Sequence, residues 1–267
     1  ALTGSTADVK AALDGTFAAG YTGNVTLNDA NTVDVAAADI STIAGDTAGT
    51  VTVSNNINLT GTSAAIATAV GDVNTFSGTP TATLGDAHTI AQLKTINDAI
   101  SGQLTLTDYS VALSGTSAQV AAALDGTFAS TYTGTAAVSD AHTLAQLKTI
   151  NNGTSGEITL TDYTVNLSGS SADVSAALAG TFASTYTGDV SLNSNHSLSE
   201  LKTISSGTTG TINLNSYSID LEGSSSDVSS ALSGSFSSTY TGNVNLTSNH
   251  SLSELKAINN ATDGTIS

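Results

Sequence analysis

The 267-residue chain contains no cysteine, no methionine, no tryptophan and no arginine, and it has a single proline. Without cysteine, neither a disulfide framework nor a thiolate metal site can form. The absence of methionine also removes a side chain that is readily oxidised. No apolar run reaches the roughly 18 residues that cross a bilayer, so we expect no membrane insertion.

Positive charge is scarce. Five lysines stand against 22 acidic residues, which gives a formal net charge of −17 at pH 7. A nucleic-acid partner is excluded on this ground, because phosphate binding requires clustered lysine or arginine. Charged residues make up only 10% of the chain, so serine, threonine, asparagine and glycine must cover most of the surface. This composition predicts an extracellular or cell-surface protein.

The feature that is present throughout is an internal repeat. Residues 113–166 return almost unchanged at 167–220, and related copies occupy 2–58, 59–112 and 221–267. A fixed period of this kind is typical of a stack of like units. We therefore predict that residues 1–267 form a single elongated repeat array without a linker. The first copy is interpreted as a divergent cap, and the last copy is incomplete.

Each copy divides into two halves, and each half reads as a short helix, a glycine-marked turn and a strand. Thr116 with Gln119 and Thr143 with Gln146 have the spacing of a capping box, which begins a helix. Alternating apolar and polar residues over 189–192, 211–214 and 218–221 predict half-buried strands. The fold class is therefore an α/β solenoid of stacked 54-residue repeats, each with two short helices and two to three short parallel strands.

Two details of this fold follow from geometry and from glycine positions. Paired strands lie about 4.8 Å apart, whereas packed helices need about 8–10 Å, so two strands per copy match one helix on each face. This predicts that the helices of the two halves lie on opposite faces. Gly126, Gly180 and Gly234 are predicted to terminate the first helix of their copies.

Histidine and lysine recur at the same place in successive copies, which at first suggests a ladder of metal or anion sites. Equivalent atoms should lie about 9–10 Å apart, whereas imidazoles that share a zinc ion each lie within about 2.1 Å of it. We therefore expect each histidine to form a local hydrogen bond just before a helix and each lysine to lie on a solvated helix face. These residues are His88, His142, His196, His250, Lys94, Lys148, Lys202 and Lys256.

No motif for catalysis or phosphate binding occurs, so we predict that the chain is not an enzyme, with no catalytic residue, no metal ligand and no cofactor. One alternative for a cofactor remains open, namely Ca²⁺ at surface turns such as Asp140 or Asp162. The repeat is broken most clearly in the first copy, where Asp34, Asp39 and Asp46 replace the histidine and lysine pattern. We interpret that break as part of the cap.

The aromatic and threonine residues have competing interpretations. Phe128, Phe182, Tyr132 and Tyr186 recur at fixed offsets, and we predict that they pack in the core rather than stack on sugars. Thr-x-Thr pairs suggest an ice-binding array, but threonine is also simply favoured on strands. Three alternative functions stay open: a surface adhesin that binds glycan, an ice-binding protein, and a virion fibre with glycan-cleaving activity.

Two stretches carry a resemblance to a known group of proteins. LSGTSAQVAAALDGTF and DAHTLAQLKTINNGTSGEITL, from the copy 113–166, resemble the repeat regions of giant secreted cell-surface proteins of marine cyanobacteria and similar bacteria. The resemblance covers every copy and implies an extracellular structural or adhesive role. It implies no catalytic residue.

We predict a non-enzymatic extracellular structural protein, a subunit or segment of a filament or cell-surface layer, whose partner is a second copy of itself. The last copy stops at the equivalent of Asn213, and Ala1 matches the residue before the leucine that begins each copy. One subunit would thus resume nearly where another stops, and open strand edges favour such an end-to-end contact. Cell-surface glycans are a second candidate partner. The predicted end-to-end interface comprises Ala1, Leu2, Thr3, Gly264, Thr265, Ile266 and Ser267.

Overall fold

The computed structural model describes residues 1–267 and contains ten short helices and eighteen short strands that pair in parallel. The predicted α/β class with short helices and parallel strands is confirmed at this level. The chain divides into two compact units, which are described separately. Unit 1 comprises residues 1–113 and 122–134, and unit 2 comprises residues 114–121 and 135–267.

Unit 1 contains four complete helices and two sheets. The helices are α1 (Thr6–Leu13), α2 (Ala37–Asp46), α3 (Ser63–Asp72) and α4 (Ile90–Ala99). One sheet has the order β1 (Leu2–Gly4), β2 (Val25–Leu27), β4 (Val51–Val53), β6 (Thr75–Phe76). The other has the order β3 (Asp34–Ala36), β5 (Asn58–Gly61), β7 (Thr81–Leu84), β8 (Gln103–Thr105), β10 (Thr127–Phe128).

Unit 2 contains five complete helices and further short parallel strands. The helices are α6 (Leu144–Gly153), α7 (Ser171–Leu178), α8 (Leu198–Gly207), α9 (Ser225–Ala231) and α10 (Leu252–Ala261). Strand β11 (Ala136–Val138) pairs with β12 (Ile158–Leu160). A four-stranded sheet has the order β13 (Leu167–Gly169), β14 (Val190–Leu192), β15 (Thr211–Asn213), β17 (Ser235–Phe236). Strand β16 (Leu221–Gly223) pairs with β18 (Val244–Leu246). The remaining elements, β9 (Leu113–Gly115) and α5 (Ser117–Leu124), include residues of both units.

The predicted capping boxes are present at the helix starts. Thr143 accepts a hydrogen bond from the Gln146 backbone N–H, and the Gln146 side chain accepts one from the Thr143 N–H. The Thr116 and Gln119 pair makes the same exchange. Such a box satisfies two N–H groups that a helix start otherwise leaves unpaired. Helices of eight to ten residues are marginal alone in water, so packing must hold them.

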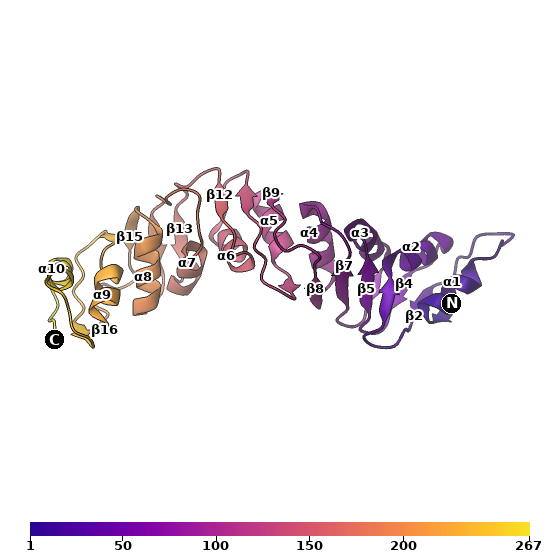
Figure 1. The fold of residues 1–267 in the computed structure, drawn as a ribbon, viewed down its shortest axis with the longest axis horizontal. Helices are drawn as coiled ribbons and strands as arrows, with labels where there is room; N and C mark the ends of the chain where they lie inside the picture. The colour runs from indigo at the N-terminus through magenta and orange to yellow at the C-terminus, as the bar shows by residue number, and fades with distance from the viewer. The chain divides into compact units, whose positions relative to one another are not determined.

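Strand pairs and helices recur along the chain at different intervals. Leu167 pairs with Val190, and Val190 pairs with Ile212. The helices are spaced more widely in the sequence, since α7, α8 and α9 begin at Ser171, Leu198 and Ser225. Neighbouring helices contact one another in sequence, from α1 to α4 in unit 1 and from α6 to α10 in unit 2 (Figure 1). The prediction that helices of the two halves lie on opposite faces is therefore wrong, because helices on opposite faces of a sheet could not touch.

The core lies between the strands and these helices. Val190 from β14 and Ile212 from β15 are 1% and 0% exposed, and Leu201 and Ile204 from α8 are completely buried. Tyr132, Tyr186 and Tyr240 are the largest fully buried side chains. The prediction that these tyrosines belong to the core is confirmed.

The three glycines predicted to terminate helices have a different role. None of them has a left-handed φ, which a glycine helix cap requires. A Cβ on Gly180 would lie 1.7 Å from Asn151 Oδ1, and one on Gly126 would lie 2.0 Å from Asn97 Oδ1. A Cβ at either position would require the asparagine side chain of the preceding helix to move. The predicted strand over 218–221 is also shifted, since β16 starts at Leu221 and ends at Gly223.

Candidate assembly interface

Histidine and tyrosine connect sequence copies within each unit. His142 precedes the helix cap Thr143, as predicted, and it is only 4% exposed. Its Nε2 lies 2.9 Å from Tyr186 Oη, 44 residues along the chain. The Tyr186 hydroxyl donates to the Val165 carbonyl oxygen at 2.7 Å, so the histidine Nε2–H must donate to the tyrosine. The prediction of a local histidine bond is therefore wrong.

The same bond occurs at the two other buried histidines. His88 Nε2 lies 2.9 Å from Tyr132 Oη in unit 1, and His196 Nε2 lies 3.0 Å from Tyr240 Oη in unit 2. The Nδ1 atom of each of these histidines is buried without a partner. Burial lowers the pKa of all three imidazoles below 6.5 and raises the pKa of the tyrosine phenols. The histidines are thus held neutral, because a proton on Nδ1 would have no acceptor.

Acidification should therefore destabilise the fold before the carboxylates titrate. As the pH falls from 7 to 5, the unfolded chain takes up protons at His142 and its two counterparts near pH 6.5, while the folded chain resists protonation. The free energy of unfolding should fall through this window and level off below the folded pKa. Urea denaturation at a series of pH values measures the slope.

A matched pair of variants isolates the histidine contribution. His142→Gln removes one buried titrating group, so its stability should depend less steeply on pH between 7 and 5 than that of the wild type. Ser184→Gln changes an exposed residue that carries no titratable group and should leave the slope unchanged. Equal slopes in His142→Gln and the wild type would contradict this account.

Two lysines of unit 2 bridge to the following helix, whereas Lys94 pairs with Asp98 of its own helix. Lys148 Nζ lies 2.5 Å from Asp173 Oδ1, and Lys202 Nζ lies 2.5 Å from Asp227 Oδ1. The lysine side chains are 41% and 46% exposed, so the prediction of a solvated face is confirmed. Surface ion pairs contribute little stability. They can still fix which helix faces which, since a like charge at either position would repel.

Two further contacts join neighbouring copies. Asn151 Nδ2 donates to the Ala176 carbonyl oxygen at 2.5 Å, and Ser205 Oγ, at the corresponding position of the next copy, donates to the Ala231 carbonyl oxygen at 2.6 Å. Leu198 packs against the backbone of Gly223, where a Cβ would lie 2.4 Å from its Cδ2 atom. These contacts cover the α8 face that points toward α9.

The strand at the end of each copy pairs with a phenylalanine of the next. Four of the five phenylalanines of the chain are engaged in this way. The pairs are Val53 with Phe76, Leu104 with Phe128, Ile158 with Phe182, and Ile212 with Phe236. The two-residue strands at Phe76, Phe128 and Phe236 and the single bridge at Phe182 were not predicted from the sequence, because they are too short to have a recognisable alternation.

The surface of α10 that corresponds to the α9-contacting face of α8 has no helix packed against it. We call it the C-terminal face and define it as His250, Leu252, Lys256 and Asn259. Leu252 is 85% exposed. His250 is also exposed, and neither Lys256 nor Asn259 has a bonding partner, unlike the residues at the same positions of the preceding copy. In Figure 1, α10 is the last helix of unit 2, and no other helix of unit 2 lies beyond it.

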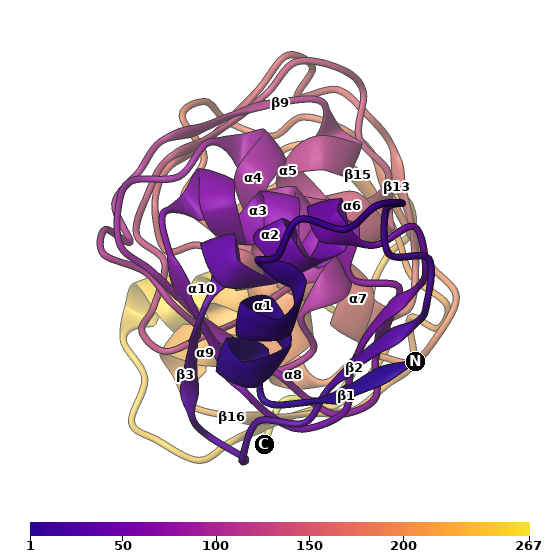
Figure 2. The same cartoon turned by 90° about the vertical axis from the view of Figure 1, so that its right-hand side faces the viewer.

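A second uncovered surface lies at α1. We call it the N-terminal face and define it as Gly4, Asp8, Phe17 and Tyr21. Phe17 is 48% exposed and pairs with no strand. Tyr21 is half-buried and lacks the histidine partner of Tyr186. Figure 2 looks onto this end of unit 1, with α1 and β1 nearest the viewer.

The interface residues predicted from the sequence lie at two strand edges. Leu2 and Thr3 belong to β1, the outer strand of its sheet, and Ala1 precedes them. Ile266 bridges to Val244 of β18, and Ser267 donates its N–H to the Val244 carbonyl oxygen. Thr265 and Gly264 lead into that pairing. Each segment is therefore the last of its sheet within its own unit.

The acidic residues considered as Ca²⁺ sites accept hydrogen bonds from nearby backbone N–H groups. Asp140 Oδ1 accepts the Ser117 N–H, and Asp162 Oδ1 accepts both the N–H and the hydroxyl of Thr164. Hydrogen bonds from Thr164 lower the pKa of Asp162. In the first copy, Asp39 pairs with Lys10. The described residues contain no group of three histidine or acidic side chains with the geometry of a metal site.

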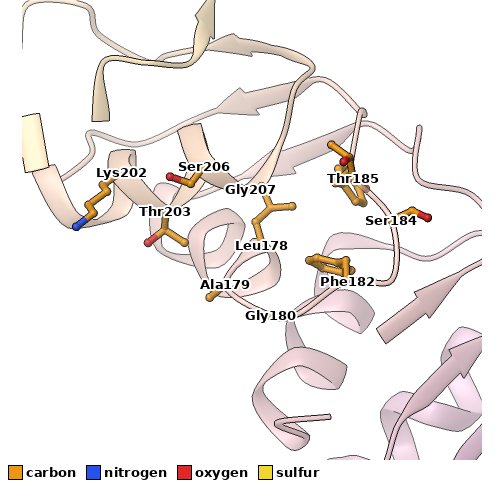
Figure 3. Close-up of a pocket in the computed structure, with 11 residues that line it drawn as sticks. Leu178, Ala179, Gly180, Phe182, Ser184, Thr185, Lys202, Thr203, Ser206 and Gly207 are labelled. Atoms are coloured by element: carbon orange, nitrogen blue, oxygen red, sulfur yellow. The ribbon is translucent and has the colours of Figure 1, made fainter. Parts of the chain in front are cut away.

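One open surface hollow of about 500 Å³ lies between α7 and α8. Figure 3 shows Phe182, Ser184 and Thr185 on the loop after α7, and Lys202 and Thr203 on α8, around this space. Phe182 also pairs with Ile158 and packs its ring on Tyr186. The ring is therefore part of the packing between copies, and we assign no ligand to the hollow.

None of the helices has both the length and the apolar character needed to cross a membrane. Comparison with family models, with curated proteins and with solved structures finds no match. The function must accordingly be argued from the geometry of the chain alone.

Proposed function

We propose that the chain is a non-enzymatic structural protein that joins copies of itself head to tail. In this proposal the alternating helices and strands form a solenoid of stacked 54-residue repeats. The solenoid is a subunit or segment of an extracellular filament or surface layer. Its task is mechanical: it extends a rigid polymer by adding one stack to the end of another.

A single observation carries the proposal, namely that successive copies contact one another through the same set of residues. His142 with Tyr186 recurs as His196 with Tyr240, and Lys148 with Asp173 recurs as Lys202 with Asp227. One side of a copy is therefore complementary to the opposite side of another copy. A heterologous contact of this kind forms a filament when it does not close into a ring.

The location outside the cell rests on composition and on the resemblance to secreted surface repeats. A surface built mainly from serine, threonine, asparagine and glycine, with 10% charged residues and no cysteine, is consistent with that setting. No cofactor is part of the proposal.

Electron microscopy of the purified chain tests the proposal. Negative-stain images over a range of protein concentrations should contain filaments whose length grows with concentration, at an ionic strength of about 0.15 M that screens the acidic surfaces. Ca²⁺ and EDTA should give the same images. Isolated particles of a single size at every concentration would overturn the proposal.

A further inference from the structure

We propose that the repeats of unit 2 form an extensible tether, which keeps its length below a threshold tension and above it unwinds, and later rewinds, one 54-residue copy at a time. This mechanical function goes beyond head-to-tail assembly and does not depend on it. It follows from the direction of the backbone hydrogen bonds, from the helix boundaries at which side chains form ties, and from the short range of the contacts along the chain.

The backbone hydrogen bonds of unit 2 run along the stack. Leu167 of β13 pairs with Val190 of β14, and Val190 pairs with Ile212 of β15. We call the chain from one strand to its pairing partner a coil, so these bonds point from one coil to the next. Tension along the stack loads them one after another, because each of these strands has only three residues. A coil can thus detach from its neighbour without a whole sheet being sheared.

The boundary between α8 and α9 is tied by side chains at three places. Lys202 pairs with Asp227, and Ser205 Oγ donates to a backbone carbonyl oxygen of α9. His196, just before α8, bonds Tyr240, which follows α9 in the chain. The boundary between α6 and α7 has the corresponding three ties, with an asparagine in place of the serine. We call these two the copy boundaries.

The boundary between α7 and α8 lies within a copy and is tied differently. The Ser171 hydroxyl donates to the Glu200 carboxylate and to the Asn195 carbonyl oxygen, and all of these contacts are only partly buried. The two lysine ion pairs and the two buried histidine–tyrosine bonds of unit 2 lie at the copy boundaries instead. Resistance to tension therefore alternates along the stack, and the copy boundaries are the stronger ones.

This alternation determines the length of a step. When tension breaks a copy boundary, the weaker boundary beside it already carries more load than it can bear, so it opens as well. Release stops at the next copy boundary, which lies 54 residues along the chain, as His142 and His196 do. A released copy of 54 residues extends to roughly 190 Å, whereas its two stacked coils occupy about 10 Å, so each step lengthens the chain by about 180 Å.

The contacts also favour rewinding when the tension falls. The His196–Tyr240 bond spans 44 residues, and the strand pairs span about half of that. Contacts of short range form quickly, and a repeat stack can refold from any part that stays folded. The chain has no cysteine, so no disulfide limits the extension or forms wrongly in the released segment.

Optical-tweezers extension of the full chain, held through cysteines added at its two ends, tests this inference. At least two steps of about 180 Å should appear, one for each copy boundary of unit 2, and they should return in a second extension after relaxation. A single rupture that releases the whole chain, steps of half this length, or steps that do not return would overturn the inference.

A matched pair of variants assigns one step to its boundary. Tyr186→Phe removes the hydroxyl that bonds His142, so it should lower the force of one step and leave the other unchanged, because force depends on the unfolding rate of the boundary that breaks. Tyr163→Phe is the control, since its hydroxyl accepts the N–H of Leu160 only three residues away. It should leave both forces unchanged. Equal effects of the two variants would contradict the role of the copy boundary.

These outcomes are separate from those of the proposed function. A chain that forms no filaments in negative stain can still release its copies stepwise. A single rupture under tension would overturn the tether while leaving head-to-tail assembly in place.

Discussion

Replacing Tyr186 by alanine is expected to lower the free energy of unfolding by about 3–5 kcal/mol, because it empties a large and fully packed position. Tyr186 is 1% exposed. Its ring lies 5.9 Å from the ring of His142 and 6.0 Å from that of Phe182, measured between centroids. The substitution also leaves the His142 N–H and the Val165 carbonyl without their partner.

Urea denaturation of three variants separates packing from hydrogen bonding. Tyr186→Phe keeps the ring but removes the hydroxyl, and it should cost about 1–3 kcal/mol because two buried polar groups lose their partner. Tyr21→Ala is the matched control, since Tyr21 is half-buried and bonds no histidine. Its effect should be much smaller. If Tyr21→Ala and Tyr186→Ala destabilise the protein equally, the tyrosine does not connect the copies.

Replacing Gly188 by alanine should destabilise the fold through the backbone. A Cβ at Gly188 would lie 2.0 Å from the Val165 carbonyl oxygen, and Gly134 and Gly242 have the same relation to Val111 and Ile219. A backbone oxygen cannot rotate away as a side chain can, so the two adjoining segments must separate. We expect a loss of about 3 kcal/mol, at the upper end of the usual cost of overpacking.

A second glycine supplies a control, because its replacement by alanine should change the free energy of unfolding in the opposite direction. Gly71 lies inside α3, and a Cβ added there would meet no other atom within 4 Å. Gly71→Ala should therefore raise the free energy of unfolding by about 0.5–1 kcal/mol, because alanine is the better helix former. Thermal and urea unfolding of the two variants measure both changes. Effects of the same sign would contradict the close approach at Gly188.

The sequence predicts those parts of the fold that depend on nearby residues. The Thr143 and Gln146 capping box forms as expected because its partners are close in the sequence, and helix geometry alone brings them together. The strand at Val190 is likewise recognisable, since burial of every second residue determines the alternation.

Contacts between copies could not be predicted, because they depend on the number of residues that separate one strand from the strand it pairs with. A strand meets its partner after fewer residues than separate the starts of successive helices. Ile212 pairs with Phe236, for example, whereas α8 begins at Leu198 and α9 only at Ser225. The difference places His142 beside Tyr186 rather than beside a residue of its own copy. Both intervals are about half a copy, so consecutive helices stack on one another instead of lying on two faces.

One signal in the sequence could have predicted a contact between copies, because each buried histidine has a tyrosine 44 residues ahead of it. The pairing of Ile212 with Phe236 gives no such signal, since the strand at Phe236 is only two residues long. The end-to-end interface at Ala1–Thr3 and Gly264–Ser267 stays a prediction.

A cryo-electron microscopy reconstruction of the assembled filament tests the central claim most directly. The account predicts subunits related head to tail, each packed on the next as α8 packs on α9 within unit 2. Subunits that associate side by side, with the C-terminal face still open to solvent, would contradict it.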